Sequence, residues 1–145
     1  MTMNILVPID TSDYSLKAAK FAVKLAKGIG ANMTLIHVVE IHPYFSVPEY
    51  LMAEDDRALK KISKSVEGWF ARIEKIAKKQ DVEIRHEILL HSTSVVESIV
   101  LYAKRRKIDL IIMGTKGTSG FKRLLVGSVA QGVSQHAHCS VLIVR

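Results

Sequence analysis

Cysteine is almost absent from this 145-residue sequence, which contains a single one, Cys139. One cysteine cannot form an internal disulfide, and this suits a reducing cytosol. Long hydrophobic runs are also missing: residues 5–9 and 99–103 form the longest, with five residues each, whereas a membrane-spanning helix needs about 20. Residues 1–10 lack a charged stretch followed by a long apolar one, so we expect no secretory signal. These absences predict a cytoplasmic protein that does not span a membrane.

Linkers rich in Ser, Gly or Pro, low-complexity tracts and internal repeats are absent as well. The length of 145 residues corresponds to about one domain. Hydrophobic residues make up 48% and charged residues 24% of the chain, the balance of a soluble globular protein rather than a disordered one. We therefore predict a single domain over residues 1–145.

Basic residues outnumber acidic ones by 21 to 14, which gives a formal net charge of +7. This excess attracts anions but does not by itself indicate nucleic acid. The lysines at 17, 20, 24 and 27 follow a helical period, which is most simply a solvated helix face. The basic run 104–107 is explained by the negative end of a helix dipole. Nucleic-acid binding is therefore not favoured.

Short β-branched runs alternate with longer segments of helical period. The runs predict strands at 4–9, 33–39, 83–90, 108–113 and 140–144, and the periodic segments predict helices at 13–28, about 54–79, 94–107 and 128–136. Ser12 and Ser94 are expected as N-caps, the latter in a capping box with Glu97. The long helix is expected to bury one stripe: Leu59, Ile62, Val66, Phe70, Ile73 and Ala77. Residues 42–48, with Pro43 and Pro48, are expected to form an irregular loop.

This alternation predicts an α/β fold, in which a parallel sheet carries helices on both faces. Ligands of such sheets bind outside the carboxyl ends of the strands, where the strand order reverses. Two stretches therefore deserve comparison with ligand-binding turns: residues 8–12 and residues 114–128.

Residues 114–128 form a glycine-rich loop with glycines at 114, 117, 120 and 127. Glycine permits positive φ and close approach of the backbone to a ligand, and consecutive N–H groups can then surround an anion. Lys116, Lys122 and Arg123 add positive charge, so phosphate is the anion that fits best. The loop is neither a Walker A motif nor Gly-x-Gly-x-x-Gly. The alternative is a plain surface connection without a ligand.

The spacing Gly114-x2-Gly117-x9-Gly127-Ser128 resembles the nucleotide-binding signature of the universal stress protein family, in its ATP-binding branch. The similarity extends over the whole chain, from residues 5–12 through 35–39 and 109–114 to 124–130 and 140–144. It implies a single-domain five-stranded parallel sheet in the order 3-2-1-4-5, an adenine nucleotide alpha hydrolase-like fold. It also implies bound ATP, or ADP or AMP, with Mg²⁺ or Mn²⁺ bridging the phosphates.

By the same resemblance, the nucleotide site would be built from the ends of the first, second and fourth strands, the glycine-rich loop and the start of the last helix. Its expected residues are Pro8, Ile9, Asp10, Val38, Met113, Gly114, Thr115, Lys116, Gly117, Thr118, Ser119, Gly120, Gly127, Ser128, Val129 and Ala130. Asp10 taken alone could be a ribose acceptor, a metal ligand or a turn residue.

No nucleophile elbow, zincin motif or placed general base is visible, so we expect no catalytic residue and at most slow or partner-dependent ATP hydrolysis. His136, His138 and Cys139 show no second ligand pair, so a metal site there is not favoured. We expect a nucleotide-dependent switch or adaptor with an unknown protein partner. The alternatives are a slow ATPase or adenylyl-transfer enzyme on the same scaffold, and a structural adaptor with an empty pocket.

Residues 140–144 are expected at one edge of the sheet, because the order 3-2-1-4-5 leaves them with one neighbouring strand. This short run is uncharged and lacks proline, so nothing in it blocks pairing with another chain. The resemblance implies the same contact, and we expect a homodimer through Ser140–Val144.

Overall fold

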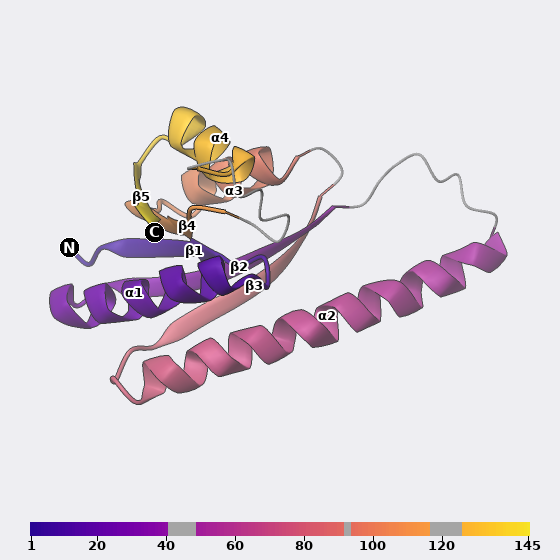
Figure 1. Cartoon of the computed structure of the whole chain (residues 1–145), viewed down its shortest axis with the longest axis horizontal. Helices are drawn as coiled ribbons and strands as arrows, with labels where there is room; N and C mark the ends of the chain where they lie inside the picture. The colour runs from indigo at the N-terminus through magenta and orange to yellow at the C-terminus, as the bar shows by residue number, and fades with distance from the viewer. Residues whose placement is uncertain (41–48, 92–93, 117–125) are drawn as a thin grey trace.

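The computed structural model describes residues 1–40, 49–91, 94–116 and 126–145 of the chain. It contains a sheet of five parallel strands in the order β3-β2-β1-β4-β5 (Figure 1). The strands are β1 (Asn4–Pro8), β2 (Asn32–Glu40), β3 (Ile84–His91), β4 (Leu110–Gly114) and β5 (Ser140–Val144). The predicted fold class and strand order are therefore confirmed.

Helices cover both faces of the sheet, with α1 (Asp13–Ile29) and α2 (Glu49–Lys78) on one side and α3 (Val95–Arg105) and α4 (Ser128–His136) on the other (Figure 1). The two-residue period of β1 sends its side chains to both layers. Ile5 and Val7 are fully buried against α1 and α2, whereas Leu6 is fully buried in the cluster that includes α3 and α4. The sheet thus separates two hydrophobic cores.

Two helices, α1 and α3, begin directly after a serine whose side chain caps the helix. The Ser12 hydroxyl accepts from the Ser15 N–H at 3.2 Å, and the Ser94 hydroxyl accepts from the Glu97 N–H at 3.0 Å. Both serines are therefore N-caps, as predicted. α1 ends at Gly30, whose φ of 67° is the left-handed conformation that glycine adopts readily.

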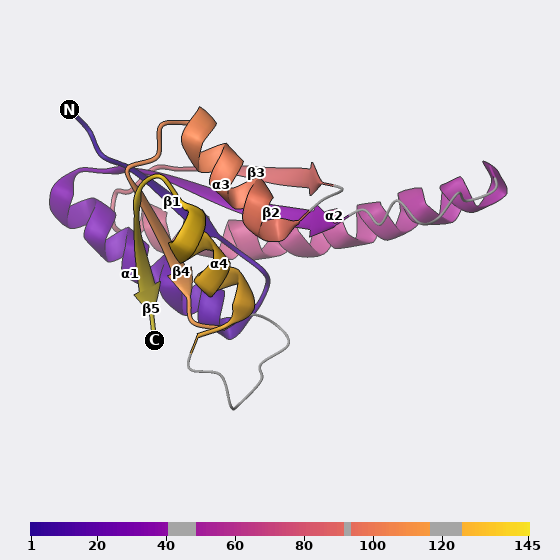
Figure 2. The same ribbon diagram turned by 90° about the horizontal axis from the view of Figure 1, so that it is seen from above.

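Helix α2 differs from the prediction in its start and in its buried stripe. It begins at Glu49 rather than near residue 54. Val66, Phe70, Ile73 and Ala77 are buried as expected, but the expectation for Ile62 is wrong, because its side chain is 40% exposed. The amino-terminal part of α2 extends past the sheet, so the apolar stripe continues where no strand lies beneath it (Figures 1 and 2). The side chain of Leu59 lies outside the described part.

Strand ends shift by one or two residues from their predicted positions. β4 starts at Leu110 rather than at 108, because Ile108 still belongs to the turn that follows α3: its N–H donates to the Ala103 carbonyl at 2.9 Å. Lys107 before it takes a φ of 52°. The loop predicted at 42–48 lies outside the described residues. Within the ranges that the structure describes, no helix is long and apolar enough to cross a membrane.

Candidate functional site

The candidate site lies at the carboxyl ends of β1 and β4, which are neighbours in the middle of the sheet. Ile5 pairs with Leu110 and Leu6 with Ile111, so both strands run in the same direction and end at the same edge. Pro8 pairs with Ile36 of β2 on the other side. The strand order reverses at β1, because the chain continues from it to β2 on one side and later returns to β4 on the other. This is the position at which open parallel sheets bind ligands.

The turn after β1 is built around Asp10. Its Oδ1 accepts from the Ser12 N–H at 3.0 Å and also from the Ser12 hydroxyl. The Asp10 N–H donates to the Ser15 Oγ at 3.4 Å, and Thr11 between them takes a φ of 63°. One carboxylate oxygen therefore has a turn role. No described residue donates to the other, Oδ2, which leaves it free to accept from a ligand.

Ile9 is held by β2 through both of its backbone polar atoms. Its N–H donates to the Ile36 carbonyl at 2.7 Å, and its carbonyl is hydrogen-bonded to Nδ1 of His37. His37 is not among the residues predicted for the site from the sequence. The one feature of the sequence that could have indicated it is its position on the predicted second strand, one residue before Val38.

The end of β4 is buried. Met113 and Thr115 are each 5% exposed, and Gly114 lies between them. A Cβ on Gly114 would lie 2.8 Å from the carbonyl carbon and the oxygen of Tyr14, in the first turn of α1. Glycine at this position is therefore required for packing of β4 on α1, whether or not a ligand is bound.

The start of α4 presents backbone N–H groups to the same region. Gly127 precedes the helix with a φ of −68° and a ψ of 161°, and its N–H donates to the Thr115 carbonyl. In the part of the chain that the structure describes, the N–H groups of Ser128, Val129 and Ala130 have no acceptor. Unpaired N–H groups and the positive end of a helix dipole favour an anion.

The described site residues thus form three groups: Pro8–Asp10 after β1, Met113–Lys116 after β4, and Gly127–Ala130 at α4. Val38, on β2, is half-buried in the same core cluster as Met113, on the α3 and α4 side of the sheet. The remaining residues predicted for the site, Gly117, Thr118, Ser119 and Gly120, lie outside the described residues, as do Lys122 and Arg123.

The fold is that of a known protein family. The model of the universal stress protein family matches residues 1–145. The chain belongs to this family. Universal stress protein MJ0531 of Methanocaldococcus jannaschii is 39% identical over 150 aligned residues, which cover 97% of this chain and 81% of that protein. Universal stress protein YxiE of Bacillus subtilis is 34% identical, with all of both chains covered.

Two solved structures share the architecture, and the first of them is a universal stress protein. UspA from Lactobacillus plantarum is similar with a TM-score of 0.88 and 29% identity, covering 99% of this chain and 97% of that one. The structure of the protein MJ0577 is similar with a TM-score of 0.83 at 24% identity, covering 99% and 96%. The second likeness concerns the fold alone.

The histidines and the cysteine near the carboxyl terminus of this universal stress protein do not form a metal site in the structure as described. Among the described residues, no group of three or more His, Cys, Asp or Glu side chains is placed to hold a metal ion, and this includes His136, His138 and Cys139. Cys139 is partly buried, and its burial raises the pKa of the thiol above the usual range.

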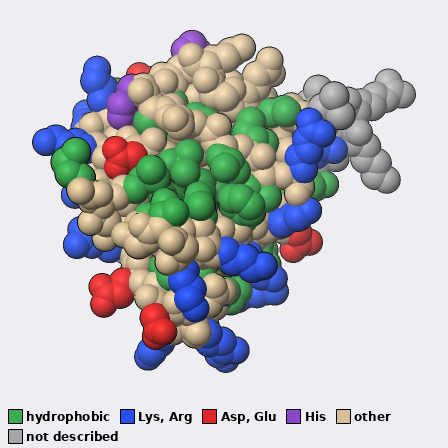
Figure 3. All heavy atoms as spheres, turned by 90° about the vertical axis from the view of Figure 1, so that its left-hand side faces the viewer, with side chains coloured by type: hydrophobic (Ala, Val, Ile, Leu, Met, Phe, Trp, Pro, Cys, Tyr) green, Lys and Arg blue, Asp and Glu red, His purple; other side chains and the backbone are tan. Residues whose placement is uncertain are grey.

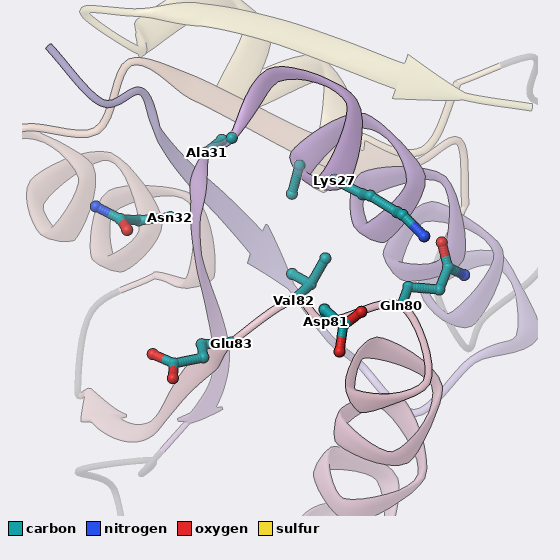
Figure 4. Close-up of a pocket in the computed structure, with 9 residues that line it drawn as sticks. Lys27, Ala31, Asn32, Gln80, Asp81, Val82 and Glu83 are labelled. Atoms are coloured by element: carbon teal, nitrogen blue, oxygen red, sulfur yellow. The ribbon is translucent and has the colours of Figure 1, made fainter.

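A pocket of about 360 Å³ lies at the opposite end of the sheet, between the last turn of α1 and the start of β3. Figure 4 shows Lys27, Gln80 and Asp81 around it. Asn32, which also lines it, is the first residue of β2, so the pocket lies at the amino ends of the strands. It is not part of the candidate site.

Proposed function

We propose that this universal stress protein binds an adenine nucleotide at the carboxyl ends of β1 and β4 and acts as a nucleotide-dependent switch or adaptor. The observation that carries the proposal is the set of N–H groups of Ser128, Val129 and Ala130, which have no acceptor among the described residues and lie beside the buried end of β4. Phosphate is the group that such an arrangement attracts most strongly. The glycine-rich signature that leads into α4 supports the same ligand.

The other site residues take roles that match their chemistry. Pro8 and Val38, which are half-buried, offer apolar surface for the base, whereas Ile9 and Met113 are buried. The Oδ2 of Asp10 is the oxygen that a ribose hydroxyl or a bridging cation would use. The N–H groups at the start of α4, with the Ser128 hydroxyl and the Lys116 ammonium, would hold the phosphates, and residues 117–120 would complete the loop around them.

Two neighbours of the same fold support adenine as the base to test first. One is a universal stress protein solved in complex with cAMP, at a TM-score of 0.73 and 23% identity. The other is a universal stress protein of Archaeoglobus fulgidus in complex with dAMP, at a TM-score of 0.64 and 19% identity. We propose ATP, ADP or AMP as the ligand of this chain.

A divalent cation, Mg²⁺ or Mn²⁺, is proposed to bridge the phosphates. Mg²⁺ commonly binds through phosphates and water with one or two protein carboxylates. Asp10 fits this need, because its Oδ2 is an oxygen donor that the turn does not use. The cation would neutralise phosphate charge and orient the nucleotide.

A switch is favoured over the alternative, a slow ATPase or adenylyl-transfer enzyme. Asp10 is the one carboxylate among the described site residues, and its Oδ1 is already bonded to Ser12. A positioned general base needs hydrogen-bond reach to the attacking group, and no second candidate lies there within the described ranges. The same proposal places the protein in the cytoplasm, which the single cysteine supports.

A homodimer through β5, and an unidentified protein partner, belong to this proposal. Within the sheet β5 pairs with β4 alone, so its outer edge is open, and residues 141–144 are half-buried. Figure 3 views the side of the molecule on which both termini lie and shows a central hydrophobic patch bordered by Lys and Arg side chains. A second copy related by a two-fold axis would cover such a face.

The test is to denature the purified protein and to identify any released nucleotide by mass spectrometry, then to measure ATP affinity by titration calorimetry. Gly127→Val should abolish measurable binding, because a branched side chain at the start of α4 blocks approach of the phosphates. Its φ of −68° is accessible to valine, so the fold should remain. The control is Gly28→Ala, since a Cβ on Gly28 has nothing within 4 Å. Wild-type affinity in Gly127→Val would contradict the proposed phosphate site.

A further inference from the structure

His37 projects from β2 toward the chain that leaves β1. Residues of β2 alternate between the two faces of the sheet, and Leu35 lies in the core cluster of α1 and α2, so His37 lies on that side too. Its Nδ1 is hydrogen-bonded to the carbonyl oxygen of Ile9. Ile9 lies one residue beyond the last residue of β1, Pro8.

We propose that His37 is a positioning residue of the nucleotide site, which sets the path of the backbone at Ile9 and thereby the place of the Asp10 carboxylate. The inference rests on the proposed function, since it concerns the same site. His37 itself need not touch the nucleotide. It acts through the peptide that links Ile9 to Asp10.

The bonds around this peptide explain why one side chain matters. The Ile9 N–H is held by the Ile36 carbonyl at 2.7 Å, as a continuation of the β1–β2 ladder. The next N–H, that of Asp10, reaches the Ser15 Oγ at a longer 3.4 Å. Between them the Ile9 carbonyl is fixed by His37 alone among the described residues. Without this bond the chain could rotate about the peptide before it reaches Asp10.

Backbone conformation makes the turn sensitive to such a rotation. Thr11 has a φ of 63°, which is unfavourable for a β-branched residue and persists only when its neighbours constrain it. The constraints that the structure shows are the His37 bond before it and the Asp10–Ser12 bonds after it. Loss of the first allows the turn to relax, and the free Oδ2 of Asp10 moves with it.

The hydrogen bond also assigns a tautomer. A carbonyl oxygen only accepts, so Nδ1 of His37 must carry the hydrogen, and in the neutral ring Nε2 is then the unprotonated nitrogen.

The experiment compares His37→Leu with His37→Asn. Leucine removes the donor, whereas the short amide of asparagine can present an N–H near the position of Nδ1. We expect His37→Leu to weaken binding of Mg-ATP by about five- to tenfold, the effect of losing one hydrogen bond of about 1 kcal/mol. His37→Asn should bind within about twofold of the wild type. Calorimetry gives both affinities.

A spectroscopic measurement tests the bond independently of the ligand. Nitrogen-15 NMR of the wild-type histidines should show His37 with hydrogen on Nδ1, and His37→Leu should shift the amide signals of Asp10 and Ser12. A His37 that carries its hydrogen on Nε2 alone, or a His37→Leu protein with wild-type affinity, would overturn the inference. If the wild type binds no adenine nucleotide, the proposed function fails, whereas the NMR result still decides whether His37 sets this turn.

Discussion

Glycine at position 114 is needed for the packing of β4 on α1, and it is also proposed to border the bound nucleotide. A Cβ there would meet the backbone of Tyr14 at 2.8 Å, and backbone cannot move aside as a flexible side chain can. We expect Gly114→Ala to lower the free energy of unfolding by about 1–3 kcal/mol, the usual cost of overpacking. Chemical denaturation of both proteins measures the difference.

The control for this prediction is Gly28→Ala on α1, which adds the same methyl group where no atom lies within 4 Å. Alanine is favoured over glycine within a helix by about 1 kcal/mol, so this variant should be as stable as the wild type or more so. If Gly114→Ala were equally stable, the close contact of β4 with α1 would be wrong.

Asp10 combines a turn role and a proposed ligand role, and one substitution separates them. Asparagine keeps an Oδ1 that can accept from the Ser12 N–H, but it removes the charge. Asp10→Asn should therefore melt within a few degrees of the wild type while it loses most of the Mg²⁺ dependence of ATP affinity. Calorimetry with and without Mg²⁺ gives this dependence. An unchanged Mg²⁺ dependence would leave Asp10 with its turn role alone.

At the scale of elements, the contact between β3 and α3 depends on a polar group of three side chains. The Tyr102 hydroxyl donates to Glu87 Oε1 at 3.1 Å, and Arg106 donates to the same oxygen at 2.9 Å. Burial, and then the bond to Glu87, raises the pKa of Tyr102 above its usual value. The folded protein therefore holds this proton more tightly than the unfolded chain does.

This pKa shift predicts a loss of stability at alkaline pH. Above a pH of about 10 the unfolded chain releases the tyrosine proton first, so the Tyr102 contribution is complete below that pH and declines as the pH rises beyond it. Wild-type unfolding free energy should fall more between pH 9 and 11 than that of Tyr102→Phe. Urea denaturation at each pH measures this. The control is Tyr14→Phe, at a tyrosine that is 40% exposed, which should fall as the wild type does.

Helix α2 contacts the edge strand β3 along its buried stripe. His86 of β3 stacks on Phe70 with ring centroids 4.8 Å apart, and its two ring nitrogens face Glu74 and Glu67 of α2, the latter at 3.5 Å. These contacts fall within the stretch of α2 that carries its buried residues, from Val66 to Ala77 among the described side chains. The part of α2 before them extends past the sheet (Figure 2).

At the scale of the whole molecule, the two edges of the sheet differ in charge. β3 carries Arg85, His86 and Glu87, and such charges discourage pairing with another sheet. β5 carries no charge, so we expect it to form the dimer contact. The variant Val141→Lys with Ile143→Lys should run as a monomer at tens of micromolar, where the wild type should be a dimer. Light scattering over a range of concentrations measures the mass.

The control for the dimer is Leu90→Lys, which adds a lysine to the opposite edge strand at a side chain that is 57% exposed. It should remain dimeric. Circular dichroism verifies that the double variant folds, and Val144→Lys, at the end of the strand, provides a milder second variant. A monomeric wild type, or a folded double variant that is still a dimer, would contradict the β5 interface.

Periodicity and local motifs were sufficient to predict the order of strands and helices, both serine caps and, with the family resemblance, the arrangement of the sheet. These features depend on residues within a few positions of one another, or on rules of chain handedness. The predicted fold class also directed attention to residues 8–12 and 114–128 at the carboxyl ends of the strands, and the family resemblance added the individual site residues. Local signals could not assign His37, whose partner Ile9 is 28 positions away.

Tertiary structure decided what periodicity leaves open. Ile62 belongs to the apolar stripe of α2, yet it is 40% exposed, because an apolar position on a helix is buried only where another element packs against it. Gly114 has the appearance of a ligand-binding glycine in the sequence, but the need for it comes first from the backbone of Tyr14, 100 residues earlier. A sequence pattern reports which face of an element is apolar, whereas burial, steric fit and hydrogen bonding depend on segments that only the folded chain brings together.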